Sequence, residues 1–165
     1  MQSYVNIKNY HVSVDVRIPE YIVSLGDEQR REKAVQADVT AWEIQDHPLF
    51  DHLKDRLYVY LPDYRIKELW GVVYGPGDYA KTHIHSGFDL SFVWYLDACT
   101  SCAPLIFPDF EHPWMPPLGI IEPNTHQLHV FPSHSEHYVP PQTCKHRRVV
   151  ISGNLYHLDN CPERP

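Results

Sequence analysis

Residues 75–96 read GPGDYAKTHIHSGFDLSFVWYL, and this stretch sets the fold around one pair of histidines. Its first four residues are a strong turn signal, and its last seven, 90–96, are apolar enough for a buried strand. Between them lie His83 and His85. Because side chains alternate along a β-strand, both imidazoles project to the same face and can reach one ion. A third ligand must come from a distant strand, and His137 is the candidate. The pattern predicts a metal site at the mouth of a sheet.

Three imidazoles suit a mid-row transition metal such as Fe(II). Three protein ligands on one face also leave coordination positions open for a cosubstrate and O₂, which suits chemistry better than a structural role. The chain has 12 histidines, so a chance His-x-His pair without a metal is the simpler alternative. The turn before the pair and the apolar run after it favour the metal site.

The composition is that of a globular protein, with 165 residues, 43% hydrophobic and 13% aromatic. We expect a single domain over residues 1–165, in which residues 1–57 form a strand and helices that support a barrel of residues 58–165. A net charge of -7 argues against binding to a nucleic-acid backbone. The chain has neither a long apolar run nor a secretory signal, so we expect no membrane span and a cytoplasmic location, in a cell or a phage-infected host.

The element pattern changes near residue 57. Before it, Val12–Val16 alternates like an edge strand that could pair across a homodimer, and residues 27–45 and 49–56 have helical character. After it, short runs rich in Val, Ile and aromatic residues are separated by Pro, Gly and Asn. These runs predict strands at 58–61, 66–74, 82–85, 90–96, 105–107, 119–122, 126–131, 137–139 and 149–158. The order predicts a mainly β jelly-roll barrel with N-terminal helices packed on one sheet.

Several of these segments, in this order, resemble the small 2-oxoglutarate and Fe(II)-dependent oxygenases of marine phages and bacteria. The segments are 70–74, 82–85, 90–96, 131–137 and 148–154. The resemblance implies a double-stranded β-helix in which His83, His85 and His137 bind Fe(II) and a late arginine binds the far carboxylate of 2-oxoglutarate. It also implies a dioxygenase that hydroxylates an unidentified substrate and releases succinate and CO₂.

Arg148 is the arginine that suits this role. On an extended strand Arg148 and Ser152 share one face, while Arg147 points the other way. A guanidinium can hold a carboxylate by two parallel hydrogen bonds, and the alternative is a paired or solvated surface charge. Ser152, Tyr79 and Ser91 are candidate hydroxyl contacts for the cosubstrate, because such pockets place a few polar groups in an apolar wall.

The second ligand departs from the wider oxygenase pattern, where it is usually Asp or Glu. Here it is His85, and Asp89 is the nearest alternative carboxylate. The same residues, with Gly77 before them, are also similar to the first cupin motif, although cupins usually lack a late arginine such as Arg148. A cupin-type dioxygenase or isomerase is therefore one alternative. A non-catalytic jelly-roll binding module is another, and it has no need of three convergent histidines.

Four cysteines form a separate pattern: Cys99, Cys102, Cys144 and Cys161. In a reducing compartment free thiols are expected rather than disulfides. Cys99-x-x-Cys102 could, with Cys144 and His146, complete a four-ligand zinc site between two loops. A lone C-x-x-C is a weak signal, and a redox pair or unligated thiols are the other interpretations.

Overall fold

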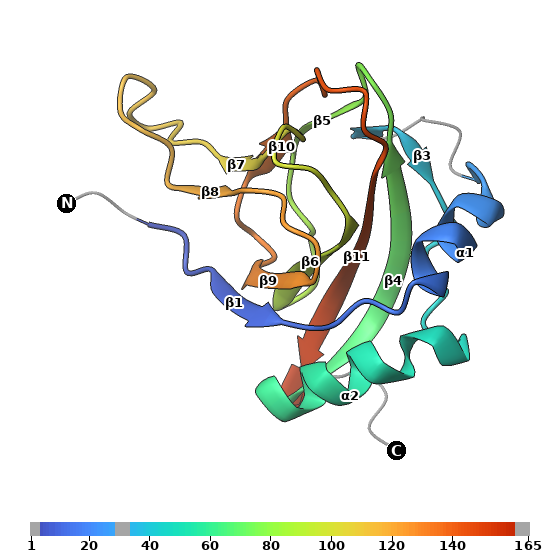
Figure 1. Ribbon diagram of the computed structural model, residues 1–165. Coiled ribbons are helices and arrows are strands. Elements are labelled where there is room, and N and C mark those ends of the chain that lie inside the picture. Colours follow the sequence, from blue (N-terminus) through green and yellow to red (C-terminus); the bar gives the residue numbers. More distant parts are fainter. Residues whose placement is uncertain (1–3, 29–33, 161–165) are drawn as a thin grey trace.

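The computed structural model describes residues 4–28 and 34–160. They form two antiparallel sheets that face each other, with two helices outside the larger sheet (Figure 1). The helices are α1 (Arg17–Leu25) and α2 (Asp51–Tyr60), with short 3-10 helices η1 (Pro48–Phe50) and η2 (Leu158–Asn160). The strands are β1 (Lys8–His11), β2 (Val35–Gln36), β3 (Asp38–Val39), β4 (Tyr64–Tyr74), β5 (Tyr79–His83), β6 (Leu90–Asp97), β7 (Leu105–Phe107), β8 (Gly119–Ile121), β9 (Gln127–Pro132), β10 (His137–Val139) and β11 (Arg148–His157).

The strand order is that of a jelly roll. The larger sheet has the order β1-β9-β6-β11-β4-β3, and the smaller one the order β2-β5-β10-β7-β8. The long central strands β4 and β11 lie side by side, with Arg148 opposite Tyr74 at one end and His157 opposite Tyr64 at the other (Figure 1). Most neighbouring strands are distant in the chain, as in a Greek-key barrel. The predicted fold class, a mainly β jelly roll with helices on one sheet, is confirmed.

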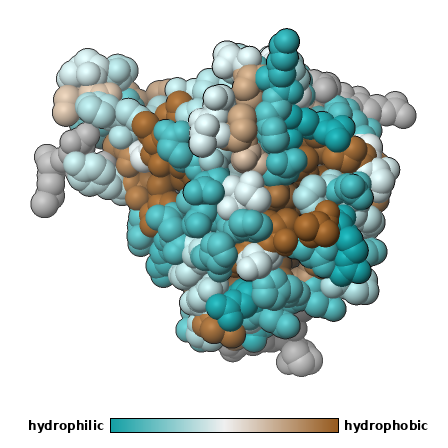
Figure 2. Space-filling model, in the orientation of Figure 1, coloured by the Kyte–Doolittle hydropathy of each residue, from teal (hydrophilic) through white to brown (hydrophobic). Residues whose placement is uncertain are grey.

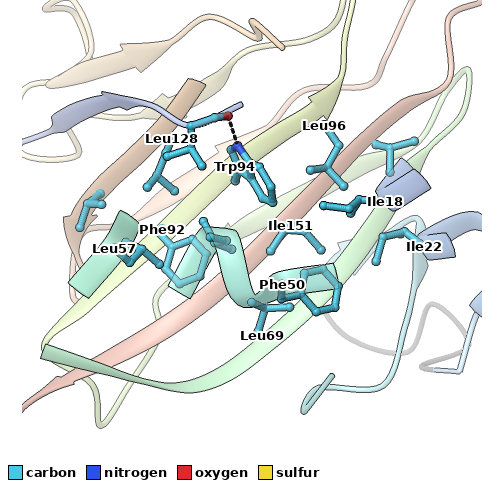
Figure 3. Packing of buried hydrophobic residues seen from close by; sticks show 14 of the residues in the cluster. Ile18, Ile22, Phe50, Leu57, Leu69, Phe92, Trp94, Leu96, Leu128 and Ile151 are labelled. Carbon is cyan, nitrogen blue, oxygen red and sulfur yellow. Dashed lines mark hydrogen bonds between the residues drawn. The ribbon is translucent and has the colours of Figure 1, made fainter. Parts of the chain in front are cut away.

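The larger sheet is apolar on both faces, because the helices cover one face and the smaller sheet covers the other. Along β11, Val149 belongs to the cluster beneath the helices and Val150 to the cluster inside the barrel. Figure 3 shows the cluster beneath the helices, in which Ile22 and the Trp94 indole are fully buried. The indole Nε1 of Trp94 donates a hydrogen bond to the Val12 carbonyl at 2.9 Å. The inner face is left to form the candidate site.

Helix α1 packs closely on β4. Ile18 and Ile22, one turn apart, are its buried residues. The close approach depends on Gly71 of β4, since a Cβ at that position would lie 2.4 Å from Ile22 Cγ2. Any larger residue there would push the helix off the sheet.

The predicted edge strand at Val12–Val16 is wrong. Val12 is buried but Val16 is 84% exposed, so the alternation does not continue across the segment. Asp15 instead accepts a hydrogen bond from the Arg17 amide at 2.9 Å and forms an ion pair with its guanidinium, at the entry to α1. The edge strand of the larger sheet next to β9 is β1, which ends at His11, just before this segment.

The predicted helix over residues 27–45 is wrong where the structure describes it, and residues 29–33 lie outside the described residues. Val35 pairs with β5 and Val39 pairs with Val72 of β4. Pairing with two open sheet edges buries Val39 and partly buries Val35, and such tertiary gains outweigh the small differences in helix propensity.

From residue 64 onward each predicted strand overlaps an observed one, but the strand predicted at 82–85 is displaced, because β5 ends at His83 and leaves His85 outside it. Those at 105–107 and 137–139 coincide with β7 and β10. The strand predicted at 58–61 is wrong, because α2 continues to Tyr60 and buries Leu57 beneath the sheet. The residues before 58 also contribute β1, β2 and β3 to the two sheets, so they complete the barrel as well as support it.

On the face in Figure 2 hydrophilic residues predominate, with hydrophobic patches between them. The loop between β7 and β8 projects from the barrel (Figure 1) and exposes Phe110, Trp114 and Met115. Within the described residues, no helix has the length and apolar character needed to cross a bilayer.

Candidate metal centre

Three histidine rings meet at one end of the barrel interior. His83 closes β5 and lies opposite His137 at the start of β10, while His85 lies two residues beyond the end of β5. The ring centroids of His83 and His137 are 4.4 Å apart, and that of His85 lies 5.3 and 5.1 Å from them. One ring nitrogen of each residue lies within 4.8 Å of the other two. The three rings can therefore share one ion.

Hydrogen bonds to the Nδ1 atoms orient all three rings. Nδ1 of His83 lies 2.6 Å from the Lys81 carbonyl oxygen, and Nδ1 of His137 lies 2.8 Å from the Ser135 carbonyl oxygen. Nδ1 of His85 lies 2.6 Å from Oδ1 of Asn154. Because these oxygens only accept, each Nδ1 carries the hydrogen, and each Nε2 keeps a free lone pair. This is how carbonyl partners fix the tautomer of metal-binding histidines.

The three rings are neutral at physiological pH. Burial lowers the pKa of His83, lowers that of His85 to about 4, and lowers that of His137 to about 3. The neighbouring rings add to the effect at His85 and His137, because a second positive charge so close is unfavourable. Neutral imidazole is the form that binds a metal, so no proton has to be displaced.

A buried network behind His85 holds that ring. Asn154 is 1% exposed, and its Nδ2 donates to Glu68 Oε2 at 2.9 Å, which turns its Oδ1 toward His85. The hydroxyl of Ser91 lies 2.8 Å from Asn154 Oδ1 and 2.9 Å from the hydroxyl of Ser133. The sequence predicts Ser91 as a cosubstrate contact, but its hydroxyl instead belongs to the hydrogen-bond network that orients the His85 ring. No sequence motif marks Asn154, and its place on the face of β11 that carries Arg148 is its one local signal.

Asp89 lies away from the three rings. Its Oδ2 accepts a hydrogen bond from the His157 amide at 2.7 Å, and its Oδ1 accepts one from Asn160 Nδ2 at 2.8 Å. The carboxylate therefore ties the end of β11 to the start of β6. The side chains that lie close enough to share one ion are those of His83, His85 and His137, and Asp89 is not among them.

Arg148 lines the same interior cavity as the three histidines. It is 2% exposed, its Nη1 donates to the Ala103 carbonyl, and its guanidinium carbon lies 4.1 Å from the centroid of the Tyr74 ring. Its Nε is buried without a hydrogen-bond partner, and no ion pair joins it to a described carboxylate. Arg147 is exposed, as strand alternation predicts. Because burying a lone charge is costly, a guanidinium in this position could hold the carboxylate of a ligand.

Other cavity walls are apolar and aromatic, with Ser152 as a partly buried hydroxyl among them. The aromatic walls come from Trp70, Tyr74, Phe92, Tyr95 and Phe131. A second hollow of about 300 Å³ opens on the outer side of His83 and His85 and is lined by Trp42 and Phe88, among other residues. The histidines therefore stand between an interior cavity and an outer hollow.

Tyr79 does not line either of these spaces. In the β5–β10 pair His83 lies opposite His137 and Ala80 opposite Val139, so three steps along β5 match two along β10. This bulge adds a residue to β5 and switches which side chains face inward. Tyr79 would share the face of His83 in a regular strand, but Ala80 takes the inward position instead.

No family model matches the chain, and no curated protein matches it either. The fold of the chain does match those of solved structures. A viral collagen prolyl hydroxylase from Paramecium bursaria Chlorella virus-1, in complex with 2-oxoglutarate, is similar with a TM-score of 0.66 at 10% identity, over 90% of this chain and 94% of that one. A Pseudomonas putida prolyl-4-hydroxylase has a TM-score of 0.64 at 15% identity, over 93% of each chain.

An iron-bound structure of HygX from Streptomyces hygroscopicus is similar with a TM-score of 0.61 at 10% identity, over 93% of this chain and 83% of that one. The likeness to all three spans nearly the whole chain at low sequence identity. The chain therefore shares the fold of these three proteins, a jelly roll of two antiparallel sheets.

Proposed function

We propose that this protein is a 2-oxoglutarate- and Fe(II)-dependent dioxygenase. The observation that carries the proposal is one cavity with two matched ends: three converging neutral imidazoles and a buried guanidinium that lacks a carboxylate partner. His83, His85 and His137 hold the iron through Nε2, and Arg148 holds the far carboxylate of 2-oxoglutarate. Cupins usually lack a late arginine such as Arg148, so the buried guanidinium favours the oxygenase over a cupin-type enzyme.

Fe(II) bound there supplies the redox chemistry by which 2-oxoglutarate, O₂ and a substrate C–H group become succinate, CO₂ and the hydroxylated product. The protein residues bind and orient the reactants. Three neutral imidazoles leave the full dipositive charge of the ion uncompensated, whereas a carboxylate ligand would cancel part of it. Dianionic 2-oxoglutarate supplies that compensation, so this ligand set favours its binding.

Within the cavity, Arg148 provides two parallel N–H donors for a carboxylate. The Tyr74 ring beneath its guanidinium and the Ala103 carbonyl restrict how the arginine can turn. Ser152 lies two strand positions from Val150 and four from Arg148 on the same face, and it adds a hydroxyl donor to the same wall. The apolar walls exclude water from the reacting groups.

The substrate approaches from the outer side of the histidines. The hollow of about 300 Å³ lined by Trp42 and Phe88 lies there, and a neighbouring hollow joins Ile84 to the base of the β7–β8 loop at Pro108. Residues 109–117 of that loop present exposed aromatic side chains beside it. We propose that this loop and the N-terminal region select the substrate.

The test is Fe(II)-dependent formation of succinate from 2-oxoglutarate in the presence of O₂, measured alone and with pools of peptides, nucleosides and small metabolites. Proline-containing peptides belong in the first pool, since two of the similar structures are named as prolyl hydroxylases. We expect succinate formation that His137→Ala abolishes and that Arg147→Lys, an exposed control, leaves unchanged. The proposed activity would be refuted if the unchanged protein formed no more succinate than His137→Ala did with any of the pools.

A further inference from the structure

Three cysteine sulfurs meet outside the cavity of the histidines and Arg148. Cys99 and Cys102 come from the loop between β6 and β7, and Cys144 comes from the loop between β10 and β11. Cys102 is 3% exposed and the other two are partly buried. Their Sγ atoms form a nearly equilateral triangle, with sides of 3.6, 3.8 and 3.8 Å.

The size of this triangle matches one face of a tetrahedral zinc–thiolate site. With Zn–S bonds of about 2.3 Å, tetrahedral geometry places two sulfurs about 3.8 Å apart. A disulfide needs about 2.05 Å between the same atoms. Cys99 and Cys102 are close in the chain, so contact between their sulfurs alone would not indicate a metal site. The sulfur of Cys144, from a different loop, lies 3.8 Å from each of them, as a shared ion requires.

Hydrogen bonds around the three sulfurs fix the conformation of the β6–β7 loop and of the β10–β11 loop. The Cys99 amide donates to Cys102 Sγ at 3.4 Å, which closes the first loop on itself. In the second loop, Nε2 of His146 lies 2.9 Å from Oδ1 of Asp97, at the end of β6, and the His146 carbonyl accepts a hydrogen bond from Gln142. The backbone that carries the three sulfurs is therefore positioned before any ion binds, which reduces the entropic cost of binding.

We propose that Cys99, Cys102 and Cys144 bind one Zn(II) ion, separate from the iron site. Soft thiolate ligands select zinc over the harder Fe(II) or Mg²⁺. Among the described residues, no further His, Cys, Asp or Glu side chain joins the group within 4.8 Å, so these three thiolates are the ligands that carry the proposal. The ion joins two loops that are otherwise distant in the chain.

The site adjoins the anion end of the cavity. Ala103, whose carbonyl accepts the hydrogen bond from Arg148, directly follows Cys102 in the chain. Zinc would thus fix the segment that orients the guanidinium. This consequence for 2-oxoglutarate rests on the proposed function, whereas zinc binding itself does not.

The test uses the full chain carrying His83→Ala, which removes the iron site from the count. The protein is stripped of metal, kept anaerobic and reduced, and titrated with Zn(II) against a chromophoric chelator. Co(II) serves as a parallel spectroscopic probe, because thiolate-to-cobalt charge-transfer absorption reports sulfur ligands and imidazole ligands give none. We expect one Zn(II) per chain and a clear thiolate–cobalt absorption.

Cys144→Ser in the same background should weaken zinc at least 100-fold and abolish the cobalt absorption, with Cys99→Ser as a second variant in case the first fails to fold. Ser101→Ala, between the two first-loop cysteines, is the matched control and should change neither. Absence of the thiolate–cobalt absorption, or unchanged zinc affinity in a folded cysteine variant, would overturn the proposal. Absence of succinate formation by the chain that keeps all three histidines, with zinc binding intact, would instead count against the proposed oxygenase function alone.

Discussion

Replacing Arg148 with Lys tests whether its planar guanidinium binds the cosubstrate. The substitution keeps the positive charge but removes the two-pronged donor geometry. A single ammonium cannot at once donate to the Ala103 carbonyl, stack on the Tyr74 ring and present two parallel N–H groups to a carboxylate. The iron site should be unaffected, since Arg148 makes no hydrogen bond to the three histidines.

The size of the effect follows from the number of hydrogen bonds lost. One charge-assisted hydrogen bond contributes about 1.5–3 kcal/mol. At about 1.4 kcal/mol per factor of ten, Arg148→Lys should weaken 2-oxoglutarate binding roughly 10- to 150-fold. The stacked tyrosine and the apolar walls argue for the upper part of that range, because water cannot easily fill the gap.

Calorimetric titration of 2-oxoglutarate into anaerobic Fe(II)-loaded protein measures this affinity, and a separate titration measures that of Fe(II). Arg147→Lys is the matched control, because Arg147 is the exposed residue immediately before β11. Unchanged 2-oxoglutarate affinity in Arg148→Lys, or an equal loss in Arg147→Lys, would refute the assignment of the anion site.

Three further predictions concern histidines. His83→Ala and His137→Ala should each abolish stoichiometric Fe(II) binding while circular dichroism shows a folded barrel, and full metal occupancy in both would remove them from the site. In anaerobic metal titrations His85→Asp should keep Fe(II), His85→Ala should lose much of the affinity, and Asp89→Ala should lose none, whereas the reverse pattern would make Asp89 the ligand. Burial lowers the pKa of His129 to about 4, so this ring is neutral in the native state while the unfolded chain takes up a proton below about 6.5. In the iron-free protein His129 should therefore lower the unfolding free energy by up to about 3 kcal/mol between pH 6.5 and pH 4, in addition to the losses from His83, His85 and His137. In denaturant titrations across that range His129→Gln should show a fall smaller by that amount, and equal slopes in the two proteins would contradict this.

Much of the site could be predicted because strand periodicity is local. His83 and His85 are two residues apart, so alternation places them on one side of the chain, although His85 lies beyond the end of β5 and Asn154 holds its ring. The same rule distinguishes buried Arg148 from exposed Arg147. Turn residues and apolar runs likewise located β7 and β10 at their observed bounds, because each is a short segment whose boundaries are marked by its neighbours.

Other features depended on contacts between distant segments. Whether β5 carries an extra residue is decided by its pairing with β10, and that bulge turned Tyr79 away from the cavity. Asn154 acts on His85 only because Glu68, on a third segment, fixes which way its amide points. The three cysteines converge only when two loops close over the same end of the barrel.

Residues 35–39 illustrate the physical reason. Their spacing suits a helix, and local propensities differ by only a few tenths of a kcal/mol per residue. Two open sheet edges nearby offer both hydrogen bonds and burial, and these exceed the local preference. Tertiary pairing therefore decides the structure wherever local preferences are this weak, and the sequence alone determines it where a turn signal and strict alternation agree.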